Sequence, residues 1–348
     1  MPTVNAWGAA HAGARLAPMT IERREPGPHD VVLDVLFCGV CHSDIHQARD
    51  EWSGAVFPMV PGHEIVGRVV RVGGDVQKFV VGDIAGIGCM VDSCRVCTSC
   101  VAGDEHFCET GGSPTYNGTE MDRVTRTQGG YSSQIVVAED FAVRVPAGLD
   151  PAAVAPLLCA GITTYSPLRE WGVKPGDRVG VVGLGGLGHM AVKLAASMGA
   201  TVTVFSTSRS KEADARRLGA TDFVVTTEPG ALAPLKNRFD LILDTVSAAH
   251  DYNALLQTIR PKGTMVVVGV PSEAVPVHAF SLIMGNRRLV GSLIGSIAET
   301  QEMLDHCAAH GVVSDVEVIA IQDINEAFER VLRSDVRYRF VIDLASLR

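Results

Sequence analysis

The sequence predicts an α/β protein of two domains, and three observations support this prediction. The chain has 348 residues, which is longer than most single hydrophobic cores can organise. Residues 1 to about 155 hold short β-branched runs punctuated by Pro and Gly, as in a β-rich domain. From Pro156 onward, strand-like runs alternate with helical patterns, which is typical of a parallel sheet.

The individual elements follow from these patterns. In the first domain, strands are expected at Val31–Leu36 and Ile65–Val72, because both runs are rich in β-branched residues. In the second part, short apolar strands are expected at Arg178–Val182, Thr201–Phe205, Leu241–Leu243 and Met265–Val268. Helical patterns lie at Lys211–Leu218, Ala249–Ile259, Glu299–His310 and Asn325–Arg333.

Composition and charge argue against several classes of partner. A net charge of −9 leaves no excess of Lys and Arg to neutralise phosphates, so neither nucleic acid nor an anionic membrane is expected. The apolar stretch Val179–Gly199 carries His189, Lys193 and several glycines, which argues against a membrane span. Residues 1–19 lack the apolar core of a signal peptide. We therefore expect a cytoplasmic protein whose nine cysteines serve metal binding or catalysis.

The stretch Gly39–His46 groups side chains of the kinds that catalysis at a metal requires. Cys41 offers a thiolate that binds a borderline-soft metal. Asp44 is of the type that holds a metal-bound histidine in one tautomer. Ser43 and His46 offer a route by which a proton can pass from the metal site to solvent.

One thiolate cannot hold zinc, so further ligands are needed. His63 and Cys159 are the candidates, because they complete a set of two thiolates and one imidazole. Such a set leaves the fourth position of the ion open, as expected of a catalytic zinc. Taken alone, Cys159 in its apolar run fits a core position better, and only the three residues together favour the metal.

Four closely spaced cysteines predict a second metal site. Two residues separate Cys94 from Cys97 and Cys97 from Cys100, and Cys108 follows after a gap of seven. Four thiolates can close around one tetrahedral ion, as expected of a structural zinc. The alternative is a set of reactive loop thiols. Cys89 lies outside this spacing and is expected to be a free thiol.

The segment Gly183–Gly188 has the pattern Gly-x-Gly-x-x-Gly and precedes a helical run at His189–Met198. Between a strand and a helix, this pattern is the dinucleotide-binding fingerprint of a Rossmann domain. Gly183 would make the tight turn, Gly185 would let the backbone approach the pyrophosphate, and Gly188 would pack the helix on the strand. Amide groups at the helix start would then face the phosphate charge.

The loop that follows the strand Thr201–Phe205 predicts NADP as the cofactor. An NAD-binding protein would carry an acid here for the ribose 2′-hydroxyl. The chain instead has hydroxyl groups and two cations, in the order Ser206, Thr207, Ser208, Arg209, Ser210 and Lys211. These groups suit a 2′-phosphate. The alternative is an ordinary polar loop between a strand and a helix.

The three signatures together resemble the zinc-dependent medium-chain alcohol dehydrogenases over nearly the whole chain. Within that family, the chain is similar to the cinnamyl alcohol dehydrogenase-type, NADP-dependent aldehyde reductases. The stretches that carry this similarity are Gly88–Cys94, Thr127–Ser132, Pro156–Gly161 and Val336–Phe340. The resemblance implies a GroES-like catalytic domain from residues 1–160 and 297–348, which would hold both zinc ions. Residues 161–296 would form a doubly wound Rossmann domain that binds NADP, in a homodimer or a tetramer.

The resemblance also implies roles for single residues. Glu64 would approach the catalytic zinc held by Cys41, His63 and Cys159, and Ser43, His46 and Asp44 match the proton relay and its support. Thr163 would face the nicotinamide, and His42 and Arg339 the pyrophosphate. The other cofactor contacts would be Gly183, Gly185, Gly186, Leu187, Gly188, Thr245, Val268, Gly269, Val270, Ser292, Leu293, Ile294 and the loop from Ser206 to Lys211. The substrate pocket would be lined by Trp52, Met90, Leu293 and Ile294.

The function implied is interconversion of primary alcohols and aldehydes, aromatic or medium-chain, with aldehyde reduction favoured. Zinc would polarise the carbonyl oxygen and NADPH would deliver the hydride. Leu293 stands where plant lignin enzymes typically carry phenylalanine, which predicts a differently shaped pocket. One alternative is a polyol dehydrogenase, although these usually carry glutamate where Cys159 stands. Another is a catalytically silent sensor that reads NADPH and uses its thiols as switches.

Overall fold

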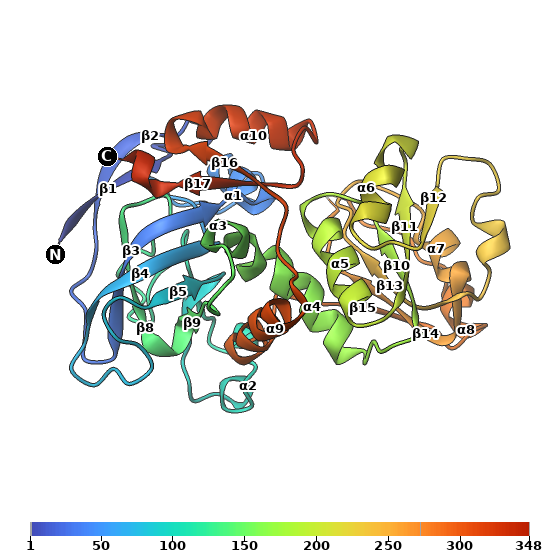
Figure 1. Cartoon of the computed structure of the whole chain (residues 1–348), viewed down its shortest axis with the longest axis horizontal. Coiled ribbons are helices and arrows are strands. Elements are labelled where there is room, and N and C mark those ends of the chain that lie inside the picture. The colour runs from blue at the N-terminus through green and yellow to red at the C-terminus, as the bar shows by residue number, and fades with distance from the viewer. Residues whose placement is uncertain (1, 272, 348) are drawn as a thin grey trace. The chain divides into compact units, whose positions relative to one another are not determined.

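The structure, a computed structural model, describes residues 2–271 and 273–347 (Figure 1). The chain divides into two compact units. The first consists of the residues up to Cys159 together with those from Gly295 onward, and the second is Ala160–Ile294. The first unit is rich in strands, and the second alternates strands with helices. This confirms the predicted α/β fold class with one β-rich and one doubly wound part.

The first unit is built on a mostly antiparallel sheet. Among the described residues this sheet has seven strands in the order β16-β17-β3-β4-β5-β9, with β8 paired to β3. Strand β3 (Asp30–Gly39) lies within the sheet, and its alternate residues Val31, Leu33 and Val35 belong to the hydrophobic core. The strands are β3 (Asp30–Gly39), β4 (Ile65–Val72), β5 (Ile84–Ile87), β8 (Gln134–Ala138), β9 (Val143–Arg144), β16 (Val316–Ala320) and β17 (Arg339–Asp343).

Smaller elements complete the description of the first unit. Two antiparallel pairs join β1 (Thr3–Gly8) to β2 (Ala17–Glu22) and β6 (Met90–Asp92) to β7 (Ser113–Pro114). The helices are α1 (His42–Ala48), α2 (Thr98–Val101), α3 (Pro151–Val154), α9 (Ile297–His310) and α10 (Ile324–Leu332). Helix α10 buries Ile324, Ala327, Phe328 and Val331, which lie at helical spacing on one apolar face.

The second unit is a parallel sheet with helices. Its described strands run in the order β12-β11-β10-β13-β14-β15, which is the doubly wound order of a Rossmann fold. The strands are β10 (Arg178–Val182), β11 (Thr201–Ser206), β12 (Asp222–Val225), β13 (Phe239–Asp244), β14 (Ile259–Val267) and β15 (Arg288–Gly291). The helices are α4 (Ala160–Glu170), α5 (Gly186–Ser197), α6 (Glu212–Arg217), α7 (Tyr252–Thr258) and α8 (Ala279–Ile283).

Several element boundaries differ from those expected. Helix α5 begins at Gly186, three residues before the expected start, because the last part of the glycine segment is itself helical. Helix α7 begins at Tyr252 instead of Ala249, because the Asp251 side chain caps it by accepting the Asn253 amide at 2.9 Å. The apolar stretch Val179–Gly199 forms β10 and α5, and no described helix is long and apolar enough to cross a membrane.

Candidate active site and metal centres

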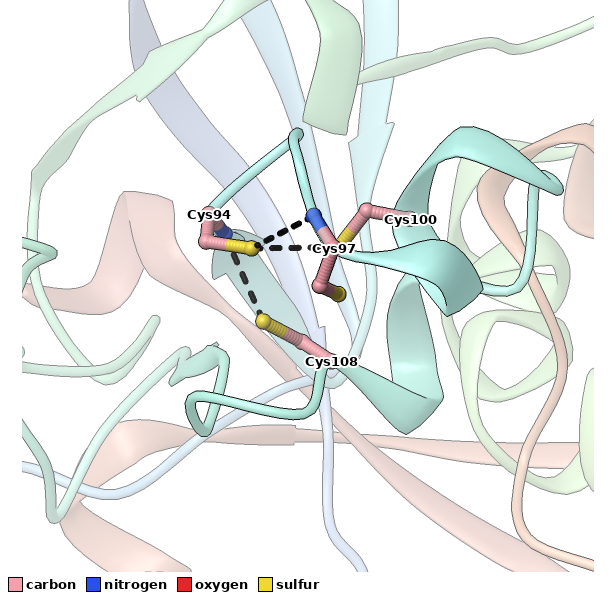
Figure 2. A group of neighbouring side chains, drawn as sticks. All are labelled: Cys94, Cys97, Cys100 and Cys108. Atoms are coloured by element: carbon pink, nitrogen blue, oxygen red, sulfur yellow. Dashed lines mark hydrogen bonds between the residues drawn. The ribbon is translucent and has the colours of Figure 1, made fainter.

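The four clustered cysteines converge on one point in the lobe after β6 (Figure 2). Their sulfur atoms all lie within 4.8 Å of one another. The Cys97 amide donates to Cys94 Sγ at 3.3 Å, and the Cys94 amide donates to Cys108 Sγ at 3.4 Å. Hydrogen bonds from the amides of Val96 and Cys97 lower the pKa of the Cys94 thiol to about 6, which favours the thiolate that zinc binds. Together with Cys100, this arrangement fits a closed tetrahedral zinc site.

Cys41, His63, Glu64 and Cys159 meet in the interior of the first unit although they are far apart in sequence. One ligand atom from each lies within 4.8 Å of the others. Cys41 immediately precedes α1, and Cys159 follows the 3-10 turn Ala155–Leu158. The two Sγ atoms are 4.0 Å apart. The structure therefore brings together the three residues that the sequence predicted as ligands, with Glu64 beside them.

Asp44 is fully buried and accepts hydrogen bonds from several sides of this ligand set. Its Oδ1 lies 3.1 Å from His63 Nδ1 and accepts the Gly62 amide at 3.1 Å. Its Oδ2 accepts the Cys41 amide at 2.9 Å and the Tyr131 hydroxyl at 3.2 Å. Because an ionised carboxylate only accepts, Nδ1 of His63 carries the proton and Nε2 is left to bind a metal.

The ionisation of Cys41 and Cys159 indicates a site that a cation would stabilise. A hydrogen bond from the Cys159 thiol, with the nearby charges of Arg339 and His63, holds the pKa of Cys41 well below its ordinary value despite burial. The same hydrogen bond, another with Cys89, and burial raise the pKa of Cys159 well above its ordinary value. Two thiolates this close repel each other, and a divalent cation between them would allow both to ionise.

Glu64 and Arg339 form a buried ion pair beside the ligand set. Glu64 Oε1 is paired with Nη2 of Arg339, and both side chains are buried. The other carboxylate oxygen, Oε2, has no hydrogen-bond partner among the described residues. An unsatisfied buried oxygen of this kind suits a carboxylate that can also approach a metal. The predicted contact of Arg339 with a pyrophosphate stays a prediction.

The predicted proton relay lies on α1. Ser43 Oγ is 3.6 Å from Cys41 Sγ. His46 Nδ1 is 2.5 Å from Glu51 Oε2, and its ring stacks on Trp52 with a centroid distance of 4.8 Å. The His46 side chain is 26 % exposed, so it can exchange a proton with solvent. The Glu51 partner could not be predicted from the sequence, because a glutamate five residues away belongs to no motif.

The other residues predicted at the reaction centre come from both units. In the first, Trp52 is exposed, Met90 is buried on β6, and the His42 ring lies 5.6 Å from that of His46. In the second, Thr163 is buried on α4, and Leu293 and Ile294 follow β15. The assembly of these residues around a substrate and a nicotinamide stays a prediction.

The glycine segment of the second unit has the three features that the pattern predicts. Gly183 has a φ of +88°, in the left-handed region that favours glycine. A methyl group at Gly188 would overlap the Gly183 carbonyl oxygen, so the helix can pack closely only on a glycine. A methyl group at Gly185 would meet no described atom within 4 Å. The backbone at Gly185 is therefore open to a ligand, as a pyrophosphate site requires.

The remaining predicted cofactor residues gather at the same edge of this sheet. Thr245 Oγ1 donates to the carbonyl of Val182, the residue just before the glycine segment, at 2.7 Å. The Ser292 amide donates to the Val267 carbonyl at 3.2 Å. Ligands of open parallel sheets bind at the carboxyl ends of the strands. The predicted residues that follow these ends are Thr245, Val268, Gly269, Val270 and Ser292.

The loop predicted to bind the 2′-phosphate is partly organised by its own contacts. Ser206 is buried, and its hydroxyl accepts the Ser208 amide at 3.2 Å. Lys211 Nζ donates to the Leu184 carbonyl at 3.0 Å, which places this cation at the glycine segment. The residues Thr207, Ser208, Arg209 and Ser210 are exposed.

Arg209 has acidic neighbours that the sequence did not reveal. Its Nη2 lies 2.5 Å from Glu228 Oε1, and its Nη1 lies 3.6 Å from Glu212 Oε2. Glu228 follows β12, so only the parallel pairing of β11 with β12 brings it to this loop. Arg209 would therefore exchange one anionic partner for another if a phosphate bound here.

Comparison with known proteins decides the family. The model of the alcohol dehydrogenase GroES-like domain matches residues 27–147, and that of the zinc-binding dehydrogenase matches residues 186–309. The NADP-dependent alcohol dehydrogenase C 1 of Mycolicibacterium smegmatis is 54 % identical over 349 residues, which cover 100 % of both chains. The protein belongs to the zinc-dependent alcohol dehydrogenase family.

Two further relatives place this alcohol dehydrogenase within its family. The aldehyde reductase YahK of Escherichia coli is 53 % identical to it over 348 residues, 99 % of each chain. The solved structure of a cinnamyl alcohol dehydrogenase from Sorghum bicolor matches with a TM-score of 0.96 and 46 % identity, covering 99 % of this chain and 98 % of that one. These relatives confirm the predicted cinnamyl alcohol dehydrogenase-type branch.

The donor groups of this alcohol dehydrogenase fit two zinc ions. Four thiols form the closed set of a structural ion. Two thiols and one imidazole, with the Glu64 carboxylate beside them, form the set of a catalytic ion, and the fourth position is open while Glu64 stays paired with Arg339. Cys89 is not in a disulfide, as expected. However, its interaction with Cys159 lowers the pKa of Cys89, so this thiol lies beside the open set. Spacing in the sequence could not show this contact. Cys89 directly precedes β6, and only the fold brings it close to Cys159.

Proposed function

We propose that the protein reduces aldehydes to primary alcohols with NADPH and catalyses the reverse oxidation with NADP. The observation that carries this proposal is the open set of Cys41, His63 and Cys159. A closed set could only stabilise the fold, whereas an open one leaves room for a substrate oxygen. The names of the relatives, an NADP-dependent alcohol dehydrogenase and an aldehyde reductase, support the same reaction.

The chain's own residues have distinct tasks in this reaction. When bound, zinc supplies a Lewis acid for the substrate oxygen, and the nicotinamide supplies or accepts the hydride. Asp44 fixes the tautomer of His63 and so keeps one ligand in its metal-binding form. The hydrogen bonds of Asp44 hold the ligands in place before the substrate arrives, so the site needs little reorganisation during the reaction.

Ser43 and His46 are assigned to proton transfer. The carboxylate of Glu51 faces Nδ1 of His46 at 2.5 Å. A carboxylate only accepts, so Nδ1 carries a proton and Nε2 is left as the basic nitrogen. In alcohol oxidation the proton of the substrate hydroxyl would pass through the Ser43 hydroxyl to Nε2 and then to solvent. Aldehyde reduction would use the same path in reverse.

NADP(H) is the proposed cofactor because β11 ends at Ser206, where an NAD-binding protein would carry an acid. Buried Ser206 occupies the end of the strand, and Lys211 reaches the glycine segment through the Leu184 carbonyl. An acid at the strand end would instead accept hydrogen bonds from the free ribose hydroxyls of NAD. Arg209 adds a second cation within the same loop.

The proposed substrates are aromatic or medium-chain aldehydes. Trp52 is 45 % exposed and Leu293 is 54 % exposed, and such apolar side chains bind apolar substrates better than polyols. A polyol dehydrogenase would need polar groups to pair with several hydroxyls. Cys159 also argues against it, since it stands where those enzymes usually carry glutamate.

The test is a set of initial rates with the zinc-loaded enzyme. NADPH oxidation would be followed with cinnamaldehyde, benzaldehyde and hexanal, and each reaction repeated with NADH. Oxidation of sorbitol with NAD would be the polyol arm. We expect turnover of the aldehydes with NADPH, slower turnover with NADH, and none with sorbitol. Turnover of sorbitol alone would support a polyol dehydrogenase, and no turnover of any substrate would support a sensor.

A homodimer is proposed from the surface of the second unit. Strand β15 is at one edge of the described sheet. Helix α8, just before it, has exposed apolar side chains at Phe280 and Ile283, and Met284, the residue that caps its end, is exposed as well. A second copy could pair its own β15 edge and cover these side chains. Light scattering on the native protein and on Ile283→Asp would test this, with a monomer expected for the variant.

A cytoplasmic location is proposed from the chemistry of the cysteines. Both metal sites need reduced thiols, and none of the cysteines is in a disulfide in the described structure. An oxidising compartment would pair such closely spaced thiols before zinc could bind. Fractionation of cells that express the protein would test this proposal.

A further inference from the structure

Asp244 and His250 face each other at the carboxyl end of β13. Asp244 is fully buried, and its Oδ2 lies 3.2 Å from Nε2 of His250. The other oxygen, Oδ1, accepts the Val246 amide at 3.2 Å. Nδ1 of His250 lies 2.8 Å from the Ala248 carbonyl oxygen, and its ring centroid lies 4.9 Å from that of Tyr252. One carboxylate and one imidazole thus close the loop of residues 245–251 onto the strand.

These contacts suit a doubly protonated imidazole facing an ionised carboxylate. A carbonyl oxygen can only accept, so Nδ1 of His250 must carry a proton. In a neutral ring, Nε2 would then present its lone pair to the Asp244 carboxylate at 3.2 Å, which is repulsive. A second proton on Nε2 turns this repulsion into an ion pair between buried Asp244 and the partly exposed His250 ring. The two atoms attract as charges and do not form a hydrogen bond with each other.

The neighbouring charges favour the same form. Burial disfavours a charged ring, but Asp244 from β13, the Ala248 carbonyl and Asp251 at the start of α7 outweigh it and raise the pKa of His250. Tyr252 is the other titratable group that faces the pair, and burial and Asp244 keep it neutral by raising its pKa above the ordinary range. The charges around this ring are therefore predominantly negative.

The loop that this pair closes is packed against the glycine segment. A methyl group at Gly183 would lie 2.6 Å from Val246 Cγ2 and 3.1 Å from Thr245 Oγ1. On the other side, the Gly269 amide donates to the Asp244 carbonyl oxygen at 3.1 Å. Residues 244–246 therefore form part of the surface from which the backbone groups of the dinucleotide site project. Displacement of this loop would disturb both Gly183 and Gly269.

We propose that His250 is a positioning residue for the dinucleotide. Its protonated ring, paired with buried Asp244, holds residues 245–251 in the conformation that seats NADP(H), and affinity for the nucleotide decreases when the ring loses its proton. This inference rests on the proposed function, because it assumes that the second unit binds NADP(H). His250 itself is not assigned a contact with the reacting atoms.

The direction of the pH dependence follows from linkage. Because the pKa of His250 is raised in the folded protein, its stabilising contribution is fully present below the unfolded value of about 6.5. It is lost as pH rises through the higher folded value. The 2′-phosphate of the nucleotide also titrates, at about pH 6. Its effect is common to wild type and variant, so it cancels in their ratio.

The experiment measures NADPH dissociation constants of the zinc-loaded protein by nicotinamide fluorescence from about pH 6 to 9. Wild type would be compared with His250→Gln, which keeps a donor but no charge, and with His278→Gln. His278 is exposed in the same unit, so its variant is the matched control. We expect His250→Gln to bind NADPH about three- to tenfold more weakly at the acidic end. The ratio to wild type should approach one at the alkaline end.

The outcomes separate the two proposals. A ratio that stays constant across the pH range would mean that His250 only fills space, and a ratio of one throughout would mean that it does not act on the nucleotide. Either result overturns the inference while NADPH binding by wild type preserves the proposed cofactor. No NADPH binding by wild type would overturn the proposed cofactor itself. Melting temperatures of both proteins without nucleotide give a second readout, and their difference should likewise vanish at high pH.

Discussion

Among single residues, Asp44 makes the contacts that hold the ligands of the catalytic set in position. It accepts the Cys41 amide, the Gly62 amide and the Tyr131 hydroxyl, and it faces His63 Nδ1. The sequence suggested only the last of these contacts. The others were missed because Tyr131 and Gly62 reach Asp44 through the fold, without any local spacing. Its substitution should therefore affect both a thiolate and an imidazole ligand.

Asp44→Asn should weaken binding at the open zinc set by about 10- to 100-fold. The amide group of asparagine can still accept one hydrogen bond, but its NH2 side cannot hold His63 in the same tautomer. Competition with a chromogenic chelator would measure the loss of zinc. Asp335→Asn, at an exposed carboxylate 67 % accessible, is the control and should retain both ions. Equal zinc affinity in Asp44→Asn and wild type would contradict this role.

Arg209→Ala should raise the Michaelis constant for NADPH and leave that for NADH nearly unchanged. A charge-assisted hydrogen bond contributes roughly 1.5–3 kcal/mol, which corresponds to about a 10- to 100-fold change. The ion pair with Glu228 should reduce this effect, since Arg209 must leave one anion for another. Glu228→Gln should accordingly lower the constant for NADPH.

The control for the cofactor variants is Arg238→Ala. Arg238 lies in the same unit and pairs with Asp222 at 3.2 Å on the exposed surface, so its loss removes a similar charge away from the loop. Steady-state kinetics with both nucleotides would compare all three variants. Equal weakening of NADPH and NADH by Arg209→Ala would remove this residue from the 2′-phosphate site.

Among the elements, helix α1 concentrates the chemistry of the first unit. Cys41 precedes it, Ser43 and Asp44 lie in its first turn, and His46 lies in its last turn. A short helix can carry ligand, ligand support and relay because residues three and four apart share one face. This explains why a stretch of eight residues was enough to predict the catalytic region.

His46→Gln should slow turnover by up to about 10²-fold if proton transfer limits the rate. Glutamine cannot take up a proton, so the path from Ser43 to solvent is interrupted. An imidazole buffer should restore part of the rate by carrying the proton instead. His310→Gln, at an exposed histidine at the end of α9, is the control. A pH–rate profile of His46→Gln identical to that of wild type would exclude the relay.

The lobe between β6 and β7 should depend on its zinc for folding. Cys97→Ser removes one of four thiolates and should lower the melting temperature and release one zinc ion per chain, because a structural zinc contributes directly to the folded state. Val96→Ser is the matched control, since Val96 is 80 % exposed in the same lobe and all four thiols remain. A Cys97→Ser protein with unchanged melting and zinc content would contradict the structural role.

Element types were more predictable from the sequence than their ends. The runs Ile65–Val72 and Arg178–Val182 form β4 and β10 without any change of boundary, because β-branched and apolar runs end at Pro or Gly. Helix α7 starts later than its apolar pattern indicates, because the Asp251 side chain caps it. The spacing of apolar residues carries no information about such a cap. Helix α5 starts earlier because Gly186 can enter a helix despite its low propensity.

For the whole molecule, the order of the metal-binding motifs and the glycine motif along the chain was sufficient to predict two units with different functions. Three motifs, each defined by close spacing, predicted the cysteine lobe, the stretch that leads into and forms most of α1, and the glycine segment. The pairs Arg209–Glu228, Glu64–Arg339 and Asp244–His250 were not predicted. Each depends on which strands are neighbours or on how a loop folds back, and the spacing of single residues carries no information about either.

We expect this zinc-dependent alcohol dehydrogenase to reduce aldehydes with NADPH at the open zinc set, while the closed set only supports the fold. The most direct measurement is NADPH oxidation with cinnamaldehyde while zinc is returned stepwise to the chelated protein, with zinc per chain determined at each step. We predict that the folded lobe is restored with one ion and that activity appears with the second. Full activity at one zinc per chain, or activity that remains after the ion at Cys41, His63 and Cys159 is removed, would contradict this account.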